Sequence, residues 1–306
     1  MALSRSLRWL MPERKKRNWK EYNESLVRRG ELLFDTDFLS GWGRELRSLN
    51  KGKEGARYRY PNSLMSMLAA IHVYLLPYRE LEGFVRMFAG HVEGLKVPDY
   101  TTMWWRISRV KVELDPSVDP KEDVTIAVDS TGIKVSNHGD WIRHVWMVKR
   151  PFIKVHLAVD VKTGKILSME VTKEEVRDGE MLVPMVEQAS SSANVTRLLG
   201  DGAYDSRANF RFLHEKGIEP VIKVRKDASA HAYGCMPRKL VALEQLDDYE
   251  RWKRRRGYGQ RARVESAISS FKRTFGEHVS SVKWKSIVNE LLVKASVYNL
   301  FVGMNP

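Results

Sequence analysis

The sequence predicts an α/β protein, with an α+β mixed sheet that follows a helical domain of helix-turn-helix-like outline. Apolar residues recur at helical spacing through residues 1–115. Near Asp115-Pro116 and Asp119-Pro120, which break regular structure, the pattern changes to short β-rich runs that alternate with helical segments. We therefore expect a helical domain over residues 1–115 and a sheet-containing domain over residues 120–306 that ends in a C-terminal helix.

The N-terminal domain is predicted to contain three successive helices. Helical spacing covers residues 63–76, before Pro77, and residues 79–89, and a third helix can begin at a cap formed by Thr101 or Thr102. Two short helices and a turn before a third helix are the outline of a helix-turn-helix, although an ordinary helical bundle gives the same pattern. Along the third helix we expect a core face of Met103, Trp104, Ile107 and Val110, and an outward, DNA-facing side of Arg106, Arg109 and Lys111.

Downstream of Pro120 the pattern predicts the order βββ-α-β-α-β. The expected strands cover residues 124–128, 152–160, 165–172, 195–200 and 218–224, the first three as an antiparallel meander. The expected helices cover residues 180–189 and 206–216, then a segment that begins near Gln260, and finally residues 287–302. Residues 228–257 are predicted to be irregular, and the polar stretch 228–249 within them has no role that follows from its sequence.

The composition indicates a polyanionic partner. The net charge is +14 and the pI is about 9.7, which favours nucleic acid. A membrane is disfavoured because no run approaches the roughly 18 apolar residues of a spanning helix, and the N-terminus lacks a secretory core, so we expect a cytoplasmic protein. The single Cys235 and eight His residues without HxxxH spacing exclude a disulfide framework and a cysteine-based zinc site. We expect any metal to be held by oxygen.

Three acidic residues are candidates for that metal site. Asp129 and Asp201 each close a predicted buried strand, and the carboxyl ends of neighbouring strands converge on one rim of a sheet. Phosphodiester chemistry can use two Mg²⁺ ions about 3.5–4 Å apart, and such hard cations take carboxylate ligands. Taken singly, each Asp could also be a turn or cap residue. A third ligand, Glu265, is what favours the metal site.

Glu265 lies within a charged helical pattern. Tyr258, Arg261, Glu265 and Lys272 are spaced so that they fall within about 60° of one helical face. The alternative is an exposed face with an Arg261–Glu265 ion pair. Residues 251–263 contain seven basic residues and no acidic one, a run that a polyanion would explain, although a solvated loop is the other interpretation. As DNA-phosphate contacts in this run we expect Arg254, Arg255, Arg256 and Arg263.

These motifs together resemble the DDE-type insertion-sequence transposases, specifically the IS-five-like group. The resemblance is carried by Asp129 in TIAVDSTG, Asp201 in LLGDGAYDS and the pattern Tyr258-x2-Arg261-x3-Glu265-x6-Lys272. The segments NWKEYNESLVRRG, YRELEGFVRMFAG and PDYTTMWWR extend it over nearly the whole chain. It implies a ribonuclease-H-like catalytic domain, two Mg²⁺ ions (with Mn²⁺ as substitute) held by the acidic triad, and DNA contacts from the Tyr258, Arg261 and Lys272 positions.

The resemblance implies a DNA transposase that binds terminal inverted repeats and catalyses metal-dependent strand cleavage and strand transfer. Its expected partners are double-stranded transposon ends and target DNA, and we expect a nucleoid-associated protein that forms a homodimer on DNA. Two alternatives stay open. One is a metal-dependent endonuclease that cuts without joining; the other is a non-catalytic DNA-binding regulator derived from a transposase, which would be expected to lack an acidic ligand. An RNA-binding protein is disfavoured because no aromatic RNP-like strand is present.

Overall fold

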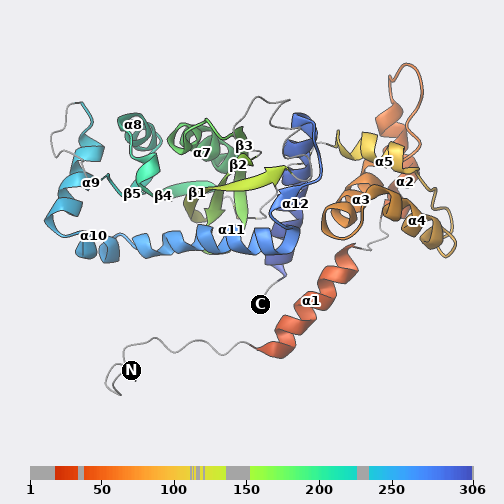
Figure 1. The fold of residues 1–306 in the computed structure, drawn as a ribbon, viewed down its shortest axis with the longest axis horizontal. Helices are drawn as coiled ribbons and strands as arrows, with labels where there is room; N and C mark the ends of the chain where they lie inside the picture. Colours follow the sequence, from red (N-terminus) through yellow and green to blue (C-terminus); the bar gives the residue numbers. More distant parts are fainter. Residues whose placement is uncertain are drawn as a thin grey trace.

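The computed structural model in Figure 1 describes residues 18–33, 38–110, 112, 114, 118–119, 121–135, 152–225 and 234–304. The N-terminal part is helical. Its described helices are α1 (Trp19–Leu33), α2 (Phe38–Asn50), α3 (Asn62–Tyr74), α4 (Tyr78–Ala89) and α5 (Tyr100–Ile107). Lys111 lies outside the described residues, so its predicted outward placement stays a prediction.

The described strands form one mixed sheet, as predicted. Its strands are β1 (Asp123–Val135), β2 (Phe152–Asp160), β3 (Ile166–Lys173), β4 (Asn194–Gly200), β5 (Glu219–Ile222) and β6 (His278–Val279). They lie in the order β3-β2-β1-β4-β5, and β6 pairs with β1. The pairs β1–β2 and β2–β3 are antiparallel, whereas β4 is parallel to β1 and to β5. β1 is therefore the central strand, flanked by the meander on one side and by the parallel strands on the other.

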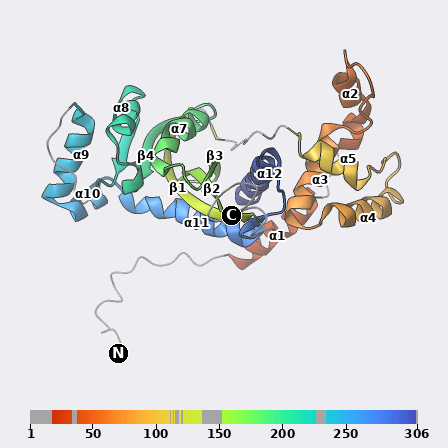
Figure 2. The same ribbon diagram turned by 45° about the horizontal axis from the view of Figure 1, so that its top comes forward.

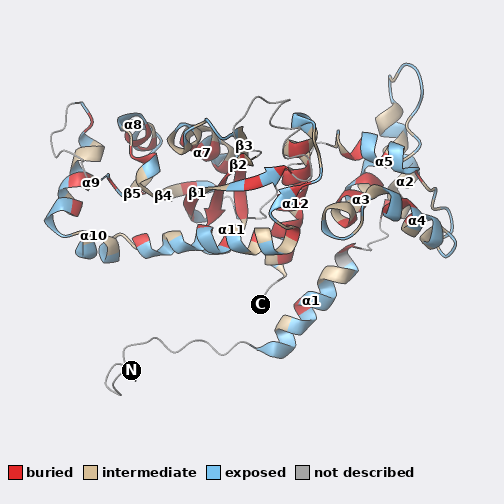
Figure 3. Cartoon of the chain, in the orientation of Figure 1, coloured by how far each residue is buried: buried red, intermediate tan, exposed pale blue. Residues whose placement is uncertain are grey.

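Helices cover both faces of this sheet (Figure 1). One face carries α7 (Leu182–Ser190) and α8 (Arg207–Glu215), and the other carries α11 (Ala262–Phe275) and α12 (Trp284–Gly303). Successive side chains of a strand point to opposite faces. In β1, Ile126 and Val128 accordingly belong to the core under α7, while Ala127 and Ile133 belong to the core under α11 and α12. Figure 3 shows the buried residues concentrated in these layers.

The N-terminal helices pack against the end of the sheet domain through α12. Leu64 and Leu68 of α3 share one buried apolar cluster with Leu291 and Tyr298 of α12, and Figure 2 shows α3 beside α12 in a second view. Among the described helices, none is both long enough and apolar enough to cross a lipid bilayer.

The helix α5 differs from its prediction. It ends at Ile107, and its start is capped by Asp99, whose carboxylate accepts a hydrogen bond from the Thr102 amide at 2.9 Å, rather than by Thr101 or Thr102. Met103 and Ile107 are buried as expected. Trp104 is 42% exposed, so its predicted core placement is wrong.

The predicted outward orientation of Arg106 is also wrong, because this side chain is buried. Its guanidinium donates hydrogen bonds to the Tyr60 carbonyl at 3.0 Å and to Asn62 Oδ1 at 2.7 Å. It also stacks on the Tyr58 ring at 4.4 Å. Arg106 therefore ties α5 to the start of α3, and Arg109 remains the exposed arginine of this region.

Residues 228–257 are not an irregular stretch throughout. They contain α9 (Met236–Asp247), with Pro237 in its first turn, and α10 (Tyr249–Arg255), capped by the Asp248 side chain. Proline suits the first turn because no helical partner is lost there. The polar composition of this stretch suggested a loop. It is polar because each of its two helices buries only a narrow face and exposes the rest.

Candidate active site

The register of two parallel strands places Asp129 and Asp201 at the same level. The last parallel pair of β1 and β4 is Ala127 with Leu199, and each Asp comes two residues later in its own strand direction. Asp201 directly follows β4 and accepts a hydrogen bond from the Ala203 amide at 2.8 Å. Asp129 was predicted to close its strand, and this is wrong, because β1 continues to Val135 through antiparallel pairing with β2. The two carboxylates nevertheless meet where the parallel pairing stops.

An arginine joins Asp129 to Glu265. Arg261 lies at the end of the short helix η4 (Tyr258–Arg261), and Glu265 is in the first turn of α11. The guanidinium Nη1 is 3.2 Å from Asp129 Oδ2, and Nη2 donates to Glu265 Oε1. The Arg261–Glu265 ion pair, which the sequence offered as the alternative to a metal site, is therefore present. It is not isolated on a solvated face, because Arg261 also bonds to Asp129 of the central strand β1.

The negative charges of both other acidic residues act on Asp129. Burial raises the pKa of Asp129, and the negative charges of Asp201 and Glu265 raise it further, while the Ser130 amide and Arg261 oppose this. A carboxylate that is repelled by two like charges favours a bound cation. In this structure the cation beside Asp129 is the guanidinium of Arg261.

The donor set suits a hard metal ion, but the side chains as placed do not form a closed metal site. In the ranges that the structure describes, no three Asp, Glu, His or Cys side chains converge closely enough to hold an ion. Three carboxylates are the ligand type that Mg²⁺ prefers. Arg261 holds Asp129 and Glu265 through its positive charge, so it acts as a stand-in cation between them.

A groove runs from this cluster along α11. Its lining includes Asp129, Ser130, Glu265, Lys272 and Glu277. Lys272 lies about two helical turns beyond Glu265 on the same side of α11, so a phosphate chain lying in the groove would reach both the carboxylates and a cation. Ser130 and Glu277 were not singled out from the sequence, because neither stands in a recognisable local pattern.

Tyr258 does not have the exposed placement that a DNA contact requires. It belongs to η4 rather than to the helix of Glu265, and it is buried against Trp252, with ring centroids 5.1 Å apart. Burial raises the pKa of its hydroxyl to about 12. Its expected role as a DNA contact is therefore corrected to one of packing η4 against α10, which positions Arg261.

The basic run is partly neutralised within the chain. Arg255 pairs with Glu244 at 2.8 Å, and Arg256 pairs with Glu244 and with Glu219 at 2.7 and 2.6 Å. These two arginines therefore brace α10 against α9 and β5. Arg254 is exposed, and Arg263, also exposed, donates to the Val161 carbonyl at 3.1 Å.

A buried tyrosine beside the acidic cluster was missed by the sequence analysis. The Tyr204 hydroxyl is buried and has no hydrogen-bond partner among the described residues. Burial raises its pKa, and the nearby charges of Asp129, Asp178 and Asp201 raise it further. Its position three residues after Asp201 is the only signal in the sequence, and alone it would not have distinguished Tyr204 from a core residue.

Comparison with known proteins identifies the family. A family model described as a transposase DDE domain matches residues 120–300, which include all three acidic residues. A second model of the same description matches residues 27–138. The chain belongs to the DDE transposase family.

Two solved transposase structures are similar to this DDE transposase at low identity. The piggyBac transposase synaptic complex with hairpin DNA is 10% identical over 90% of this chain and 74% of that chain, with a TM-score of 0.38. The Drosophila P element transposase strand transfer complex is 15% identical over 66% of this chain and 43% of that chain, with a TM-score of 0.29. Both scores are too low to establish a shared fold, so the family assignment rests on the family match.

Proposed function

We propose that this DDE transposase binds the terminal inverted repeats of an insertion sequence and catalyses metal-dependent cleavage and transfer of DNA strands. The observation that carries the proposal is that Asp129 and Asp201 lie level on the neighbouring strands β1 and β4, and that Arg261 joins Asp129 to Glu265. The strand order β3-β2-β1-β4-β5 supports a ribonuclease-H-like assignment for this domain. The sequence motifs favour the IS-five-like group within the family.

In this proposal Asp129, Asp201 and Glu265 would hold Mg²⁺, with Mn²⁺ as substitute. Two such ions would stabilise charge on the attacking and leaving oxygens of the phosphodiester. Arg261 would leave the carboxylates when the cation binds and turn its guanidinium to a DNA phosphate, for which its planar fork is suited. Lys272, farther along the groove, would hold the next part of the backbone.

The N-terminal helices would supply end recognition. The helices α3, α4 and α5 follow one another as in a helix-turn-helix, which supports this assignment. With Arg106 buried, the exposed side chains of α5 and its following turn that would reach DNA include Trp104, Trp105 and Arg109. Arg109 stacks on Trp105 at 4.4 Å, which holds its charge at the surface.

The proposal is tested with duplex DNA made from the genomic flanks of the gene. The purified chain should bind these ends with a steep salt dependence, because phosphate contacts release counterions. It should cut them with Mg²⁺ or Mn²⁺ and be inert with EDTA. Cleavage undiminished by the chelator, or stoichiometric zinc in metal analysis, would overturn the proposed chemistry.

Joining separates the proposal from its nearest alternative. A nuclease would release cut ends but give no product in which an end is covalently linked to a second plasmid. The non-catalytic regulator is disfavoured because all three acidic residues are present. Strand-transfer products recovered from a target plasmid would support the transposase, and cleavage without them would favour the nuclease.

A further inference from the structure

The outer face of α9 is an exposed apolar stripe. Met236, Leu240, Leu243 and Leu246 are 57%, 54%, 42% and 60% exposed. At about 100° per residue, the four fall within an arc of about 120°. Figures 1 and 3 place α9 at the end of the molecule opposite the N-terminal helices, with no described element over this side. Large apolar side chains gathered in this way mark an interaction surface.

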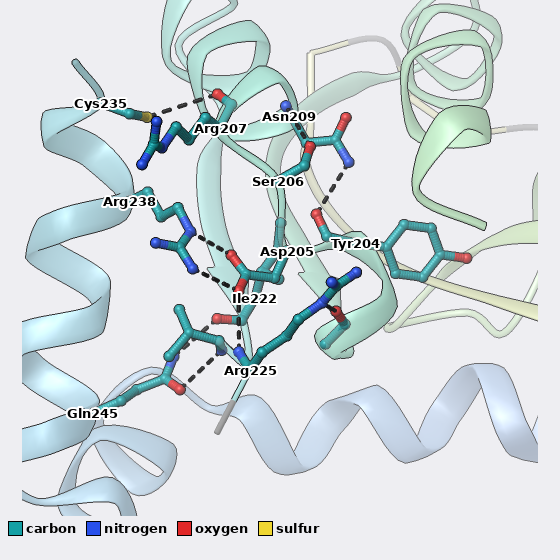
Figure 4. Close-up of polar contacts among 12 residues, drawn as sticks. Tyr204, Asp205, Ser206, Arg207, Asn209, Ile222, Arg225, Cys235, Arg238 and Gln245 are labelled. Carbon is teal, nitrogen blue, oxygen red and sulfur yellow. Dashed lines mark hydrogen bonds and ion pairs between the residues drawn. The ribbon is translucent and has the colours of Figure 1, made fainter. Parts of the chain in front are cut away.

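The opposite face of α9 is rigidly mounted on the sheet domain, as Figure 4 shows. Arg238 forms a two-pronged ion pair with the buried Asp205, at 2.6 and 2.9 Å. Gln245 accepts from the Val224 amide at 3.1 Å and donates to the Ile222 carbonyl at 2.9 Å. Ala242, between them, is buried. The inner face of α9 is thus held against the sheet domain by hydrogen bonds and an ion pair. The fold therefore keeps the outer face of α9 exposed.

The charges on the outer face are self-complementary. Lys239 and Asp247 lie within the same arc as the four apolar residues, and neither forms an ion pair with another described residue. If two copies of α9 pair antiparallel about a twofold axis at Leu243, Leu240 meets Leu246 of the second copy. In the same register Lys239 meets Asp247 of the second copy, twice by symmetry. Oppositely charged residues flanking an apolar seam set the orientation of paired helices.

We propose that α9 pairs with the α9 of a second copy of this chain, antiparallel and centred on Leu243. A twofold interface requires a surface that is complementary to itself, and this register meets that requirement in both its apolar and its charged positions. One helix pair buries less than the roughly 1,200–2,000 Å² of a stable interface, so the association is weak and concentration-dependent. It needs neither DNA nor metal, and its failure would leave the proposed chemistry untouched.

The decisive experiment uses two charge variants of the full chain in sedimentation velocity. Lys239→Asp alone places like charges together at both ends of the seam, as does Asp247→Lys alone, so each variant should self-associate at least tenfold more weakly than wild type. Mixed together, the two variants restore both ion pairs and should form a heterodimer. Met87→Glu, which changes an exposed apolar residue on α4, is the control and should associate as wild type does.

A disulfide experiment locates the axis. Leu243→Cys should cross-link to itself under mild oxidation, whereas Met87→Cys should not, and the native Cys235 is buried. Far-ultraviolet circular dichroism of each variant verifies folding. A wild type that stays monomeric at all concentrations, or charge variants that associate as wild type does and fail to pair selectively, would overturn the proposal.

Discussion

The change of Asp205 to Asn tests how α9 is mounted. The Asp205 side chain has no exposed surface, and its partner Arg238 is only 17% exposed. It also accepts a hydrogen bond from the Arg225 amide at 3.0 Å. The amide would leave the guanidinium without a counter-charge in a buried place, and breaking a buried ion pair from one side costs about 3–5 kcal/mol. Because Asn can still accept one hydrogen bond, we expect a loss near the lower end, about 3 kcal/mol.

The assay is urea unfolding followed by circular dichroism, with Asp160→Asn as the matched control. Asp160 accepts from the Lys162 and Thr163 amides in a turn, a role that Asn also performs. The control should therefore lose less than about 1 kcal/mol. A double-mutant cycle with Arg238→Met should recover a coupling energy between Asp205 and Arg238. An Asp205→Asn variant within about 0.5 kcal/mol of wild type would refute the buried ion pair.

Three further predictions concern stability in acid, the burial of Arg106 compared with Arg109, and the DNA contact of Lys272. Burial and Lys154 lower the pKa of His156 to about 4, against the pull of Asp178. The contribution of His156 to the free energy of unfolding is therefore complete above pH 6.5 and falls by about 3 kcal/mol as the pH drops toward 4. His156→Gln should flatten this part of a urea-midpoint profile, and an unchanged slope would contradict the prediction. Arg106→Ala should destabilise the chain by about 2 kcal/mol or more, because it leaves the Tyr60 carbonyl and Asn62 without their hydrogen-bond donor. Arg109→Ala should instead leave the urea midpoint unchanged and reduce the salt slope of end-binding by about 1. Equal destabilisation by both variants would be inconsistent with a buried Arg106 and an exposed Arg109. Lys272→Ala should weaken DNA binding and leave Mn²⁺ binding at wild-type strength, and a parallel loss of Mn²⁺ affinity would count against its assignment to the phosphate backbone.

The parts of the fold that sequence alone predicted are those with strong local patterns. The strands β2 to β5 and the first part of β1 appear as short β-rich runs, and the predicted ends of two of them brought attention to Asp129 and Asp201, although β1 continues past Asp129. Convergence of these residues follows from strand direction, which the order of strands and helices already indicates. Glu265 was singled out by its helical spacing from Arg261, and in the structure it pairs with Arg261 and lines the groove along α11.

The parts that sequence did not predict depend on partners far along the chain. Arg106 was expected to face solvent because it was assigned to the polar side of its helix, but its hydrogen bonds go to residues more than forty positions away. Asp205 stands just before α8, but Ser206 caps that helix by accepting from the Asn209 amide at 3.1 Å, and the partner of Asp205 is Arg238 on α9. The basic run conceals ion pairs to Glu219 and Glu244. No local pattern reveals such pairings, since each partner belongs to a different element.

The central claim is that Asp129, Asp201 and Glu265 form a metal site in which Arg261 substitutes for the ion. It is tested most directly by titrating Mn²⁺ into the full chain and measuring bound ion by electron paramagnetic resonance. Wild type and the Asp160→Asn control should bind Mn²⁺ alike, and Asp129→Asn, Asp201→Asn and Glu265→Gln should each weaken binding at least tenfold, because each removes an anionic ligand. Arg261→Gln should bind Mn²⁺ more tightly than wild type, since it removes the competing cation. Amide variants that bind Mn²⁺ as strongly as wild type would contradict the claim.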